Sequence, residues 1–248
     1  MARVLCPLPD RDFDTTEVAV PWHVLRRAGH EIVFATERAG TVPACDPRLL
    51  SGVLFGQLGA AADAKALYAQ LVDDAAFRAP LAWDALRVAD HDALLLPGGH
   101  APGMRQYLGS SALQAQIAAF WALGRPVAAI CHGVLALARS IDPATGKSVL
   151  ASSKTTCLPK YMERTAYFIT AWKLGGYYRT YPAYVEDEVK AALGNAEAQF
   201  VRGPRTLTDR DRDDDGHAGF VVEDGRYVSA RWPGDAWTFA KALLRRLD

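Results

Sequence analysis

The chain has few cysteines and no excess of either charge. Its 248 residues include four cysteines (Cys6, Cys45, Cys131 and Cys157), and 28 basic residues balance 28 acidic ones. Cysteines this sparse and this far apart are not typical of a disulfide framework or a zinc site. A chain without net charge has no long-range attraction for nucleic acid or for an anionic membrane. We therefore expect no metal, no nucleic acid and no membrane among its partners.

Long apolar runs are also absent, and so is the pattern of a secretory signal peptide. No apolar segment approaches the length that spans a bilayer. The chain begins Met-Ala-Arg-Val-Leu, which starts a strand at once, without a charged and then apolar leader. Half of the residues are nevertheless apolar, which is enough for a core without disulfides. These features predict a cytoplasmic protein with reduced thiols.

Strand-like and helix-like segments alternate along the chain, which predicts an α/β fold with a mostly parallel sheet covered on both faces. Strands are expected at 4–8, 31–35, 93–96, 126–130, 154–158 and 198–202, and helices at 15–28, 61–72, 111–123, 134–140, 161–171, 186–193 and 232–247. Asp224-Gly225 divides residues 219–230 into a hairpin. Residues 40–90 interrupt the alternation, and we interpret them as a small cap inserted into one domain that spans residues 1–248.

The sequence Ala129-Ile130-Cys131-His132-Gly133 has the pattern of a nucleophile elbow. It joins an apolar strand to a helix rich in alanine and leucine. In such a turn only small flanking side chains fit, and the central side chain is forced out at the carboxyl end of the strand. The helix N-terminus and the adjacent histidine both favour a thiolate. The pattern predicts Cys131 as a nucleophile with a depressed pKa and His132 as its general base.

A second turn, Gly98-Gly99-His100, follows the apolar strand expected at 93–96. Glycines have no Cβ, so their backbone N–H groups approach a ligand closely. Ligands of open α/β sheets bind where the carboxyl ends of strands meet. If the two strands are neighbours, the amides of Gly99 and His132 face the same developing oxyanion. We therefore predict Gly98, Gly99 and His100 as oxyanion- and substrate-binding residues.

The Gly98-Gly99-His100 turn and the Cys131 elbow, set in a flavodoxin-like α/β pattern, resemble the ThiJ/PfpI superfamily, which is related to the class I glutamine amidotransferases. Glu17 is a further match, because the family places an acidic residue in the first turn of the first helix, close to the cysteine sulfur. The resemblance implies a flavodoxin-like three-layer α/β/α sandwich, no cofactor and a homodimer. A carboxyl group beside a thiolate should be protonated, since two adjacent negative charges raise its pKa.

The insertion and the Cys131-His132 pair are similar to the branch that contains heat-shock holding chaperones and glyoxalase III-type enzymes. In that branch an acid about thirty positions after the cysteine completes a triad, and Glu163 is the matching residue here. Its carboxylate would fix the imidazole tautomer. The resemblance implies that Cys131 attacks the carbonyl carbon of a small-molecule substrate, a 2-oxoaldehyde that becomes a 2-hydroxy acid.

The same residues leave other functions open. A cysteine elbow also serves amidases and peptidases, a low-pKa thiol serves a redox sensor, and a holding chaperone acts through an exposed apolar surface. Tyrosines at 177, 178, 181 and 184 either wall a pocket or contact a second subunit. The acidic run at 209–215 imitates the start of a calcium loop, but its twelfth position is Val222 and not a glutamate, so a solvated turn is the simpler interpretation.

Overall fold

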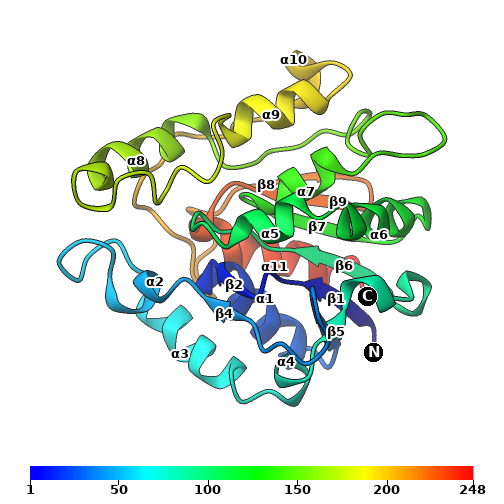
Figure 1. Ribbon diagram of the computed structural model, residues 1–248, viewed down its shortest axis with the longest axis horizontal. Helices are drawn as coiled ribbons and strands as arrows, with labels where there is room; N and C mark the ends of the chain where they lie inside the picture. The colour runs from blue at the N-terminus through cyan, green and yellow to red at the C-terminus, as the bar shows by residue number, and fades with distance from the viewer. Residues whose placement is uncertain (248) are drawn as a thin grey trace.

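The computed structural model describes residues 1–247, which form a central sheet with helices on both faces (Figure 1). Seven strands lie in the order β5-β3-β1-β6-β7-β9-β8, all parallel except β8. The strands are β1 Arg3–Pro7, β3 Glu31–Thr36, β5 Leu81–Ala82, β6 Ala93–Leu96, β7 Val127–Ile130, β8 Val221–Asp224 and β9 Tyr227–Ala230, and β2 Arg11–Phe13 with β4 Ala44–Cys45 forms a separate parallel pair. Every residue of β6 and β7 is buried, as in the centre of parallel sheets. The predicted α/β fold is confirmed.

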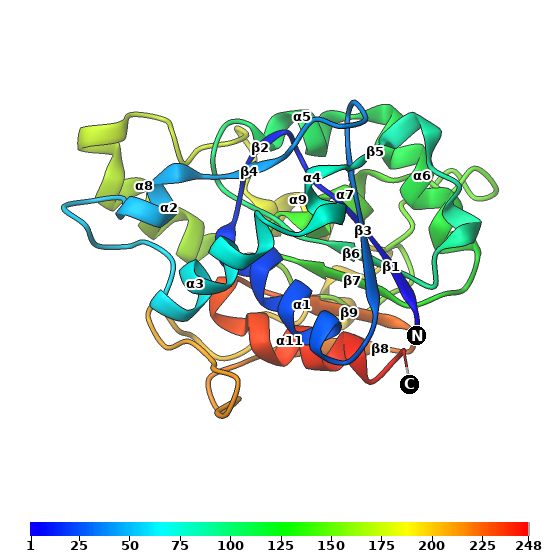
Figure 2. The ribbon, with the colours of Figure 1, turned by 90° about the horizontal axis from the view of Figure 1, so that it is seen from below.

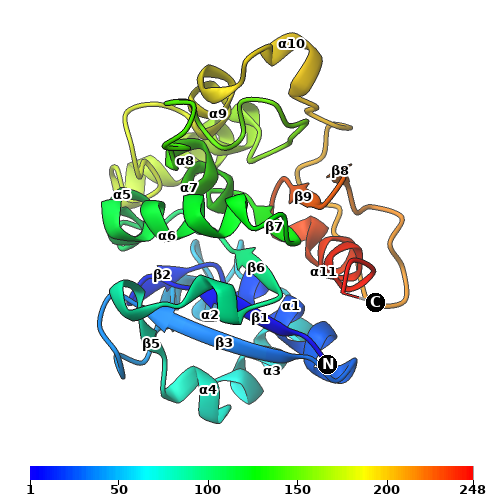
Figure 3. The same cartoon turned by 90° about the vertical axis from the view of Figure 1, so that its right-hand side faces the viewer.

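Helices form a layer on each face of the sheet, and a further group lies outside one of them. On one face α1 packs against α3 and α11, and on the other α7 packs against α5 and α6. Figure 3 shows α8, α9 and α10 stacked beyond α7. The helices are α1 Thr15–Arg27, α2 Pro47–Ser51, α3 Ala62–Leu71, α4 Ala75–Arg78, α5 Met104–Gly109, α6 Ser111–Ala122, α7 Gly133–Arg139, α8 Lys160–Leu174, α9 Val185–Ala192, α10 Ala196–Gln199 and α11 Ala236–Leu244, with 3-10 turns at Trp83–Ala85, Val88–Asp90 and Pro233–Asp235.

Most of the 40–90 insertion belongs to the main body of the molecule. β5 pairs with β3 at the edge of the sheet, and α3 packs on α1. Only the segment around α2 and the loop that follows it projects as a cap, and this segment lies beside α8 (Figure 2). There the rings of Phe55 and Trp172 stack with their centroids 6.2 Å apart. α3 carries apolar side chains that are buried when the helix packs in the layer covering the sheet. This packing explains why α3 belongs to the main body.

Two expected strands, at 154–158 and 198–202, are not strands of the sheet. They meet in an isolated parallel bridge between Thr155 and Phe200, and part of the second segment is the short helix α10. The position beside β9 is occupied by β8, and neither segment pairs with a strand of the sheet. The backbone of Thr156 is instead satisfied by the Ser229 hydroxyl, 3.0 Å away.

The described residues contain neither a disulfide nor an arranged metal site. All four cysteines are free and buried, and residues 1–247 hold no group of three or more His, Cys, Asp or Glu side chains placed to bind a metal ion. Within the same residues no helix combines the length and the apolar character needed to cross a membrane.

Candidate active site

Cys131 lies at a strained turn between β7 and α7. Its φ of 58° falls in the left-handed region, which costs a residue with a side chain of order 1–3 kcal/mol. The amide of Cys131 donates to the carbonyl of Ala230 on β9, 3.1 Å away, which holds the turn against the sheet. A Cβ on Gly133 would lie only 2.1 Å from the carbonyl oxygen of Leu96. The elbow geometry expected from the small flanking residue is therefore present.

The Gly98 turn lies directly beside the elbow, because β6 and β7 are parallel neighbours. A Cβ on Gly98 would come within 2.6 Å of the His132 nitrogen, so no larger residue fits between the two turns. The amide of Gly98 donates to Glu17 Oε2 at 2.7 Å and is not free for a ligand. The amides of Gly99 and His132 thus stay the predicted oxyanion donors.

Glu17 is fully buried, and the start of α1 holds it in place. The carboxylate of Asp14 caps this helix by accepting the amides of Thr16 and Glu17 at 2.8 and 3.2 Å. Burial raises the pKa of Glu17 well above its ordinary value, and the charge of Asp14 raises it further. One oxygen of Glu17 accepts the Gly98 amide, and the carboxyl group also forms a side-chain hydrogen bond with Cys131.

The imidazole of His132 lies between the sulfur of Cys131 and a second imidazole. Its Nδ1 is 3.5 Å from Sγ of Cys131, and its ring packs edge-on against that of His100 with centroids 4.6 Å apart. Burial lowers the pKa of His132 well below its ordinary value, and the nearby His100 and Arg139 act in the same direction. Burial lowers the pKa of His100 to about 4. Both rings are neutral at neutral pH, and His132 is available to accept a proton.

The expectation of a depressed pKa at Cys131 is wrong. The side chain is only 2% exposed, and burial raises the pKa of its thiol, with the charges of Glu17 and Asp14 acting in the same direction. The amide of His132 lowers that pKa, but by less than burial raises it. The site therefore starts from a neutral thiol beside a neutral imidazole. Such a pair reacts by general-base transfer of the thiol proton as the sulfur attacks.

The structure does not bring Glu163 into contact with His132. Glu163 is buried in the first turn of α8, where one carboxylate oxygen accepts the amide of Val185 at 3.0 Å and the other contacts the Arg179 guanidinium at 3.4 Å. These partners belong to α9 and the loop before it. The hydrogen bond expected between Glu163 and His132 is absent, and no other acid among residues 1–247 hydrogen-bonds to His132. Three of the predicted catalytic residues, Cys131, His132 and Glu17, therefore lie side by side. Glu163 lies apart from them.

Comparisons with known proteins establish the family of the chain. The sequence profile described as ThiJ/PfpI family-like matches residues 8–204. The chain belongs to this family. An uncharacterized protein of Schizosaccharomyces pombe is 29% identical over 241 residues, which cover 95% of this chain and 80% of that protein. A deglycase of Pyrococcus abyssi is 26% identical over 99% of both chains. The structure of glyoxalase III from Candida albicans superposes with a TM-score of 0.71 at 22% identity, covering 99% of this chain and 97% of that one, which supports the fold.

In this ThiJ/PfpI chain the loop between α8 and α9 covers the candidate site. No sequence pattern indicates the residue that holds this loop in place, which is Asp46. The ring of Tyr178 packs on His100 with centroids 5.8 Å apart, and the Thr180 hydroxyl donates to the His100 carbonyl at 2.6 Å. The hydroxyls of Tyr177 and Tyr178 both donate to the carboxylate of Asp46, at 3.1 and 3.2 Å. Tyr178 therefore walls the site. Asp46 lies more than a hundred residues away from these tyrosines in sequence, so no local pattern signals the contact.

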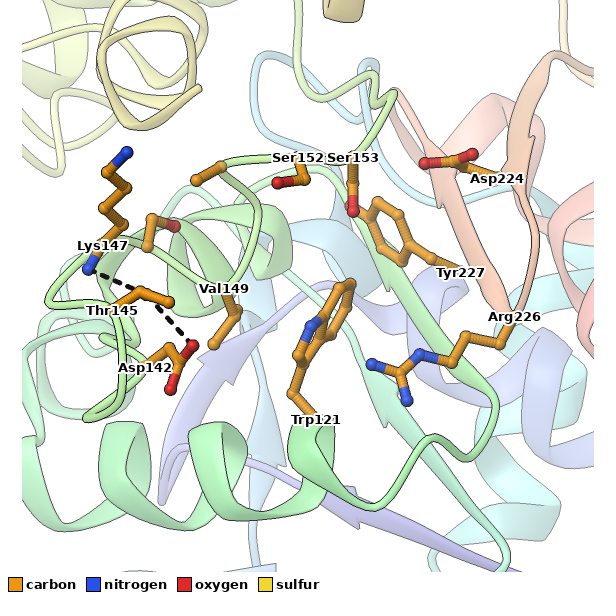
Figure 4. A pocket seen from close by; sticks show the side chains of 12 residues that line it. Trp121, Asp142, Thr145, Lys147, Val149, Ser152, Ser153, Asp224, Arg226 and Tyr227 are labelled. Carbon is orange, nitrogen blue, oxygen red and sulfur yellow. Dashed lines mark hydrogen bonds between the residues drawn. The ribbon is translucent and has the colours of Figure 1, made fainter. Parts of the chain in front are cut away.

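Two other polar features of the chain lie apart from the nucleophile. A hollow of about 610 Å³ has Trp121, Lys147 and Arg226 in its wall (Figure 4). The hollow adjoins the first residue of β9, whereas Cys131 adjoins its last residue. The hollow therefore lies at the opposite ends of the strands from Cys131. In the acidic run, Asp211 accepts the amides of α11, and Asp213 pairs with arginine and lysine side chains. These partners explain the run without a bound cation.

Proposed function

We propose that the protein is a cysteine-dependent, cofactor-free enzyme that acts on a small carbonyl compound, with a 2-oxoaldehyde as substrate and a 2-hydroxy acid as product. The observation that carries this proposal is the strained Cys131 with the Nδ1 of a neutral His132 3.5 Å from its sulfur. Relatives named deglycases and a structurally similar protein named glyoxalase III support carbonyl chemistry.

The reaction that we propose begins with attack of Cys131 Sγ on the aldehyde carbon while His132 Nδ1 takes the thiol proton. The π electrons of the C=O bond move to the carbonyl oxygen, which then takes the proton from His132. The product is a hemithioacetal. The hydrogen on this carbon then moves as a proton to the adjacent ketone carbon through an enediol, so that one carbon is oxidised and the other reduced. Water hydrolyses the resulting thioester, which releases the 2-hydroxy acid and restores the thiol. No external oxidant or reductant is needed.

Other groups around Cys131 have defined roles in this proposal. The amides of Gly99 and His132 stabilise the developing oxyanion. The carboxyl group of Glu17 holds the Gly98 turn by accepting its amide and lies beside the Cys131 side chain, with which it forms a hydrogen bond. The orienting role of Glu163 stays a prediction, and it requires the carboxylate to leave Val185 and turn toward His132.

The decisive experiment compares purified wild-type protein with Cys131→Ser and Cys45→Ser on a panel of 2-oxoaldehydes, amides and peptides. We expect turnover of 2-oxoaldehydes by the wild type and by Cys45→Ser, and loss of at least a thousandfold in Cys131→Ser. Turnover of amides or peptides alone would instead establish a hydrolase. Equal 2-oxoaldehyde turnover by Cys131→Ser would refute the nucleophile.

A holding chaperone is the second candidate, because one apolar surface is exposed. Phe55, Phe168 and Trp172 are exposed by 79%, 62% and 68%, and they lie on the projecting loop and on the adjacent α8. Surfaces of this kind mark interaction sites when they are contiguous. Suppression of client aggregation by the Cys131→Ser variant as well as by the wild type would separate this activity from thiol chemistry.

A further inference from the structure

An aromatic tip projects at the end of the molecule where α8 and the loop after α2 lie side by side (Figure 2). It consists of four exposed apolar side chains, Phe55 on that loop and Phe168, Ile169 and Trp172 on α8. The rings of Phe55 and Trp172 stack. Trp172 follows Ile169 by three residues and Phe168 by four, so these side chains share one face of the helix. Only three of the 15 residues of α8 are buried, and the fold leaves this face uncovered.

The backbone around Phe55 makes its exposure doubly unfavourable. Leu54 and Gln57 close a tight turn, in which the Gln57 amide donates to the Leu54 carbonyl at 2.7 Å. The two central residues, Phe55 and Gly56, have positive φ values of 48° and 77°, as in a type I′ turn. Asparagine, aspartate or glycine is usual at the first of these positions, because a bulky side chain there is strained. A residue that is both strained and exposed without a packing role is typical of a functional surface.

The charged side chains around the aromatic tip are basic. The segments 47–61 and 160–184, which carry the tip, contain five basic residues and one acid, Glu163. Glu163 is buried, so it presents no negative charge at the surface. The exposed cations Arg164 and Lys173 lie 5.8 and 4.7 Å above phenyl rings of the tip, and neither forms an ion pair within residues 1–247. The tip therefore combines an apolar surface with local positive charge.

The shape and the charge of the aromatic tip distinguish between kinds of partner. The tip is formed by a projecting turn and an exposed helix face, and none of its side chains lines the four main hollows found within residues 1–247. Apolar helical segments of partner proteins are typically held in grooves. A second copy of the chain would bring the same cations together, which opposes association. A bilayer with anionic headgroups needs no groove, accommodates aromatic rings at its interface and attracts the cations.

We propose that the aromatic tip is a membrane-docking surface that binds bilayers containing anionic lipids. Its four apolar side chains enter the boundary between headgroups and acyl chains, and Arg164 and Lys173 contact the anionic headgroups. The expectation of no membrane partner rested on the net charge of the whole chain, whereas adsorption depends on the charge within a Debye length of the surface. Docking is independent of the proposed reaction, because the tip contains none of the residues around Cys131.

The first test measures co-sedimentation of the full chain with vesicles of phosphatidylcholine and with vesicles of equal parts phosphatidylcholine and phosphatidylserine. We expect the wild type to bind the mixed vesicles at least tenfold more tightly, because each cation near an anionic surface contributes about fivefold. Phe55→Asn should weaken this binding at least fivefold while its melting temperature is unchanged or higher, because asparagine suits the turn. Leu207→Ser, which changes an exposed leucine outside the tip, should bind like the wild type. Absence of binding by the wild type, or equal binding by a folded Phe55→Asn, overturns the proposal.

The basic residues are tested separately with the same two kinds of vesicle. Lys173→Gln should weaken binding to the mixed vesicles about fivefold and leave binding to neutral vesicles unchanged. Arg38→Gln, which removes an exposed charge elsewhere, should behave as the wild type does. Equal binding of the wild type to both kinds of vesicle overturns the proposal.

The second test uses Trp172 as a probe of insertion, since it is the exposed member of the six tryptophans. Lipids with brominated acyl chains quench tryptophan fluorescence on contact, so mixed vesicles that contain them should quench the wild type. Trp172→Phe keeps an aromatic ring and should still bind, but most of the quenching should be lost. Equal quenching in this variant overturns the proposal. Suppression of client aggregation, or self-association lost in Phe55→Asn, without any vesicle binding would assign the tip to a client or to a second copy and overturns it as well.

Discussion

Replacing Glu163 by glutamine tests whether this carboxyl group anchors α8 as a buried acid. Burial raises the pKa of Glu163 to about 7, against the lowering effects of the Val185 amide and the Arg179 charge. The difference from the ordinary value of 4.5 is worth about 3 kcal/mol of unfolding free energy. Because the folded state binds the proton more tightly than the unfolded state, this contribution is present below pH 4.5 and is lost as the pH rises through about 7.

Glutamine is neutral at every pH, so the Glu163→Gln variant does not lose this part of the unfolding free energy as the pH rises. Urea unfolding gives the unfolding free energy of both proteins at pH 5 and at pH 8. We expect the difference between Glu163→Gln and the wild type to shift in favour of the variant by about 2–3 kcal/mol from pH 5 to pH 8. Glu197→Gln, an exposed change on α10, serves as the control and should follow the wild type at both pH values. A pH dependence in Glu163→Gln equal to that of the wild type would refute the argument. Turnover of the same variant shows separately whether Glu163 orients His132.

Three further outcomes are expected. Gly133→Ala should destabilise the fold by about 1–3 kcal/mol or more, because its Cβ would lie 2.1 Å from a backbone carbonyl, whereas Gly176→Ala, which meets nothing within 4 Å, should be neutral in the same thermal melts. Asp235→Asn should cost about 3–5 kcal/mol in chemical denaturation, since it leaves the buried Arg231 charge uncompensated. The lowered pKa of His132 predicts a kcat/KM profile without an acid limb near pH 6.5, and a limb there would contradict a neutral imidazole.

The local patterns of the sequence predicted the fold and the sharp turn at Cys131. Fully apolar runs such as those of β6 and β7 are typical of central parallel strands. The steric demand of the elbow is visible in the sequence because only small residues fit beside Cys131. The acidic residue in the first turn of α1, Glu17, was instead suggested by the family resemblance, because a glutamate at a helix start is ordinary by itself.

Properties that depend on distant segments were not predictable. The pKa of Cys131 is governed by burial beneath the covering loop, and the neighbouring residues in sequence suggested the opposite direction. The partners of Glu163 come from a loop whose path no propensity specifies. The segments at 154–158 and 198–202 have strand-like composition, but they meet only in one isolated bridge outside the sheet, and β8 is the strand that pairs with β9.

The double hydrogen bond that Asp46 accepts from Tyr177 and Tyr178 has a consequence for protein engineering. A designer who exchanges the loop over the site for that of a relative, while keeping the native residues around α2, would leave this buried carboxylate with the Arg48 amide but without its two tyrosine donors. Each polar group stranded in this way costs about 1–3 kcal/mol. Chimeras intended to alter substrate preference should therefore exchange both segments together. Natural variation at the two segments is expected to be correlated for the same reason.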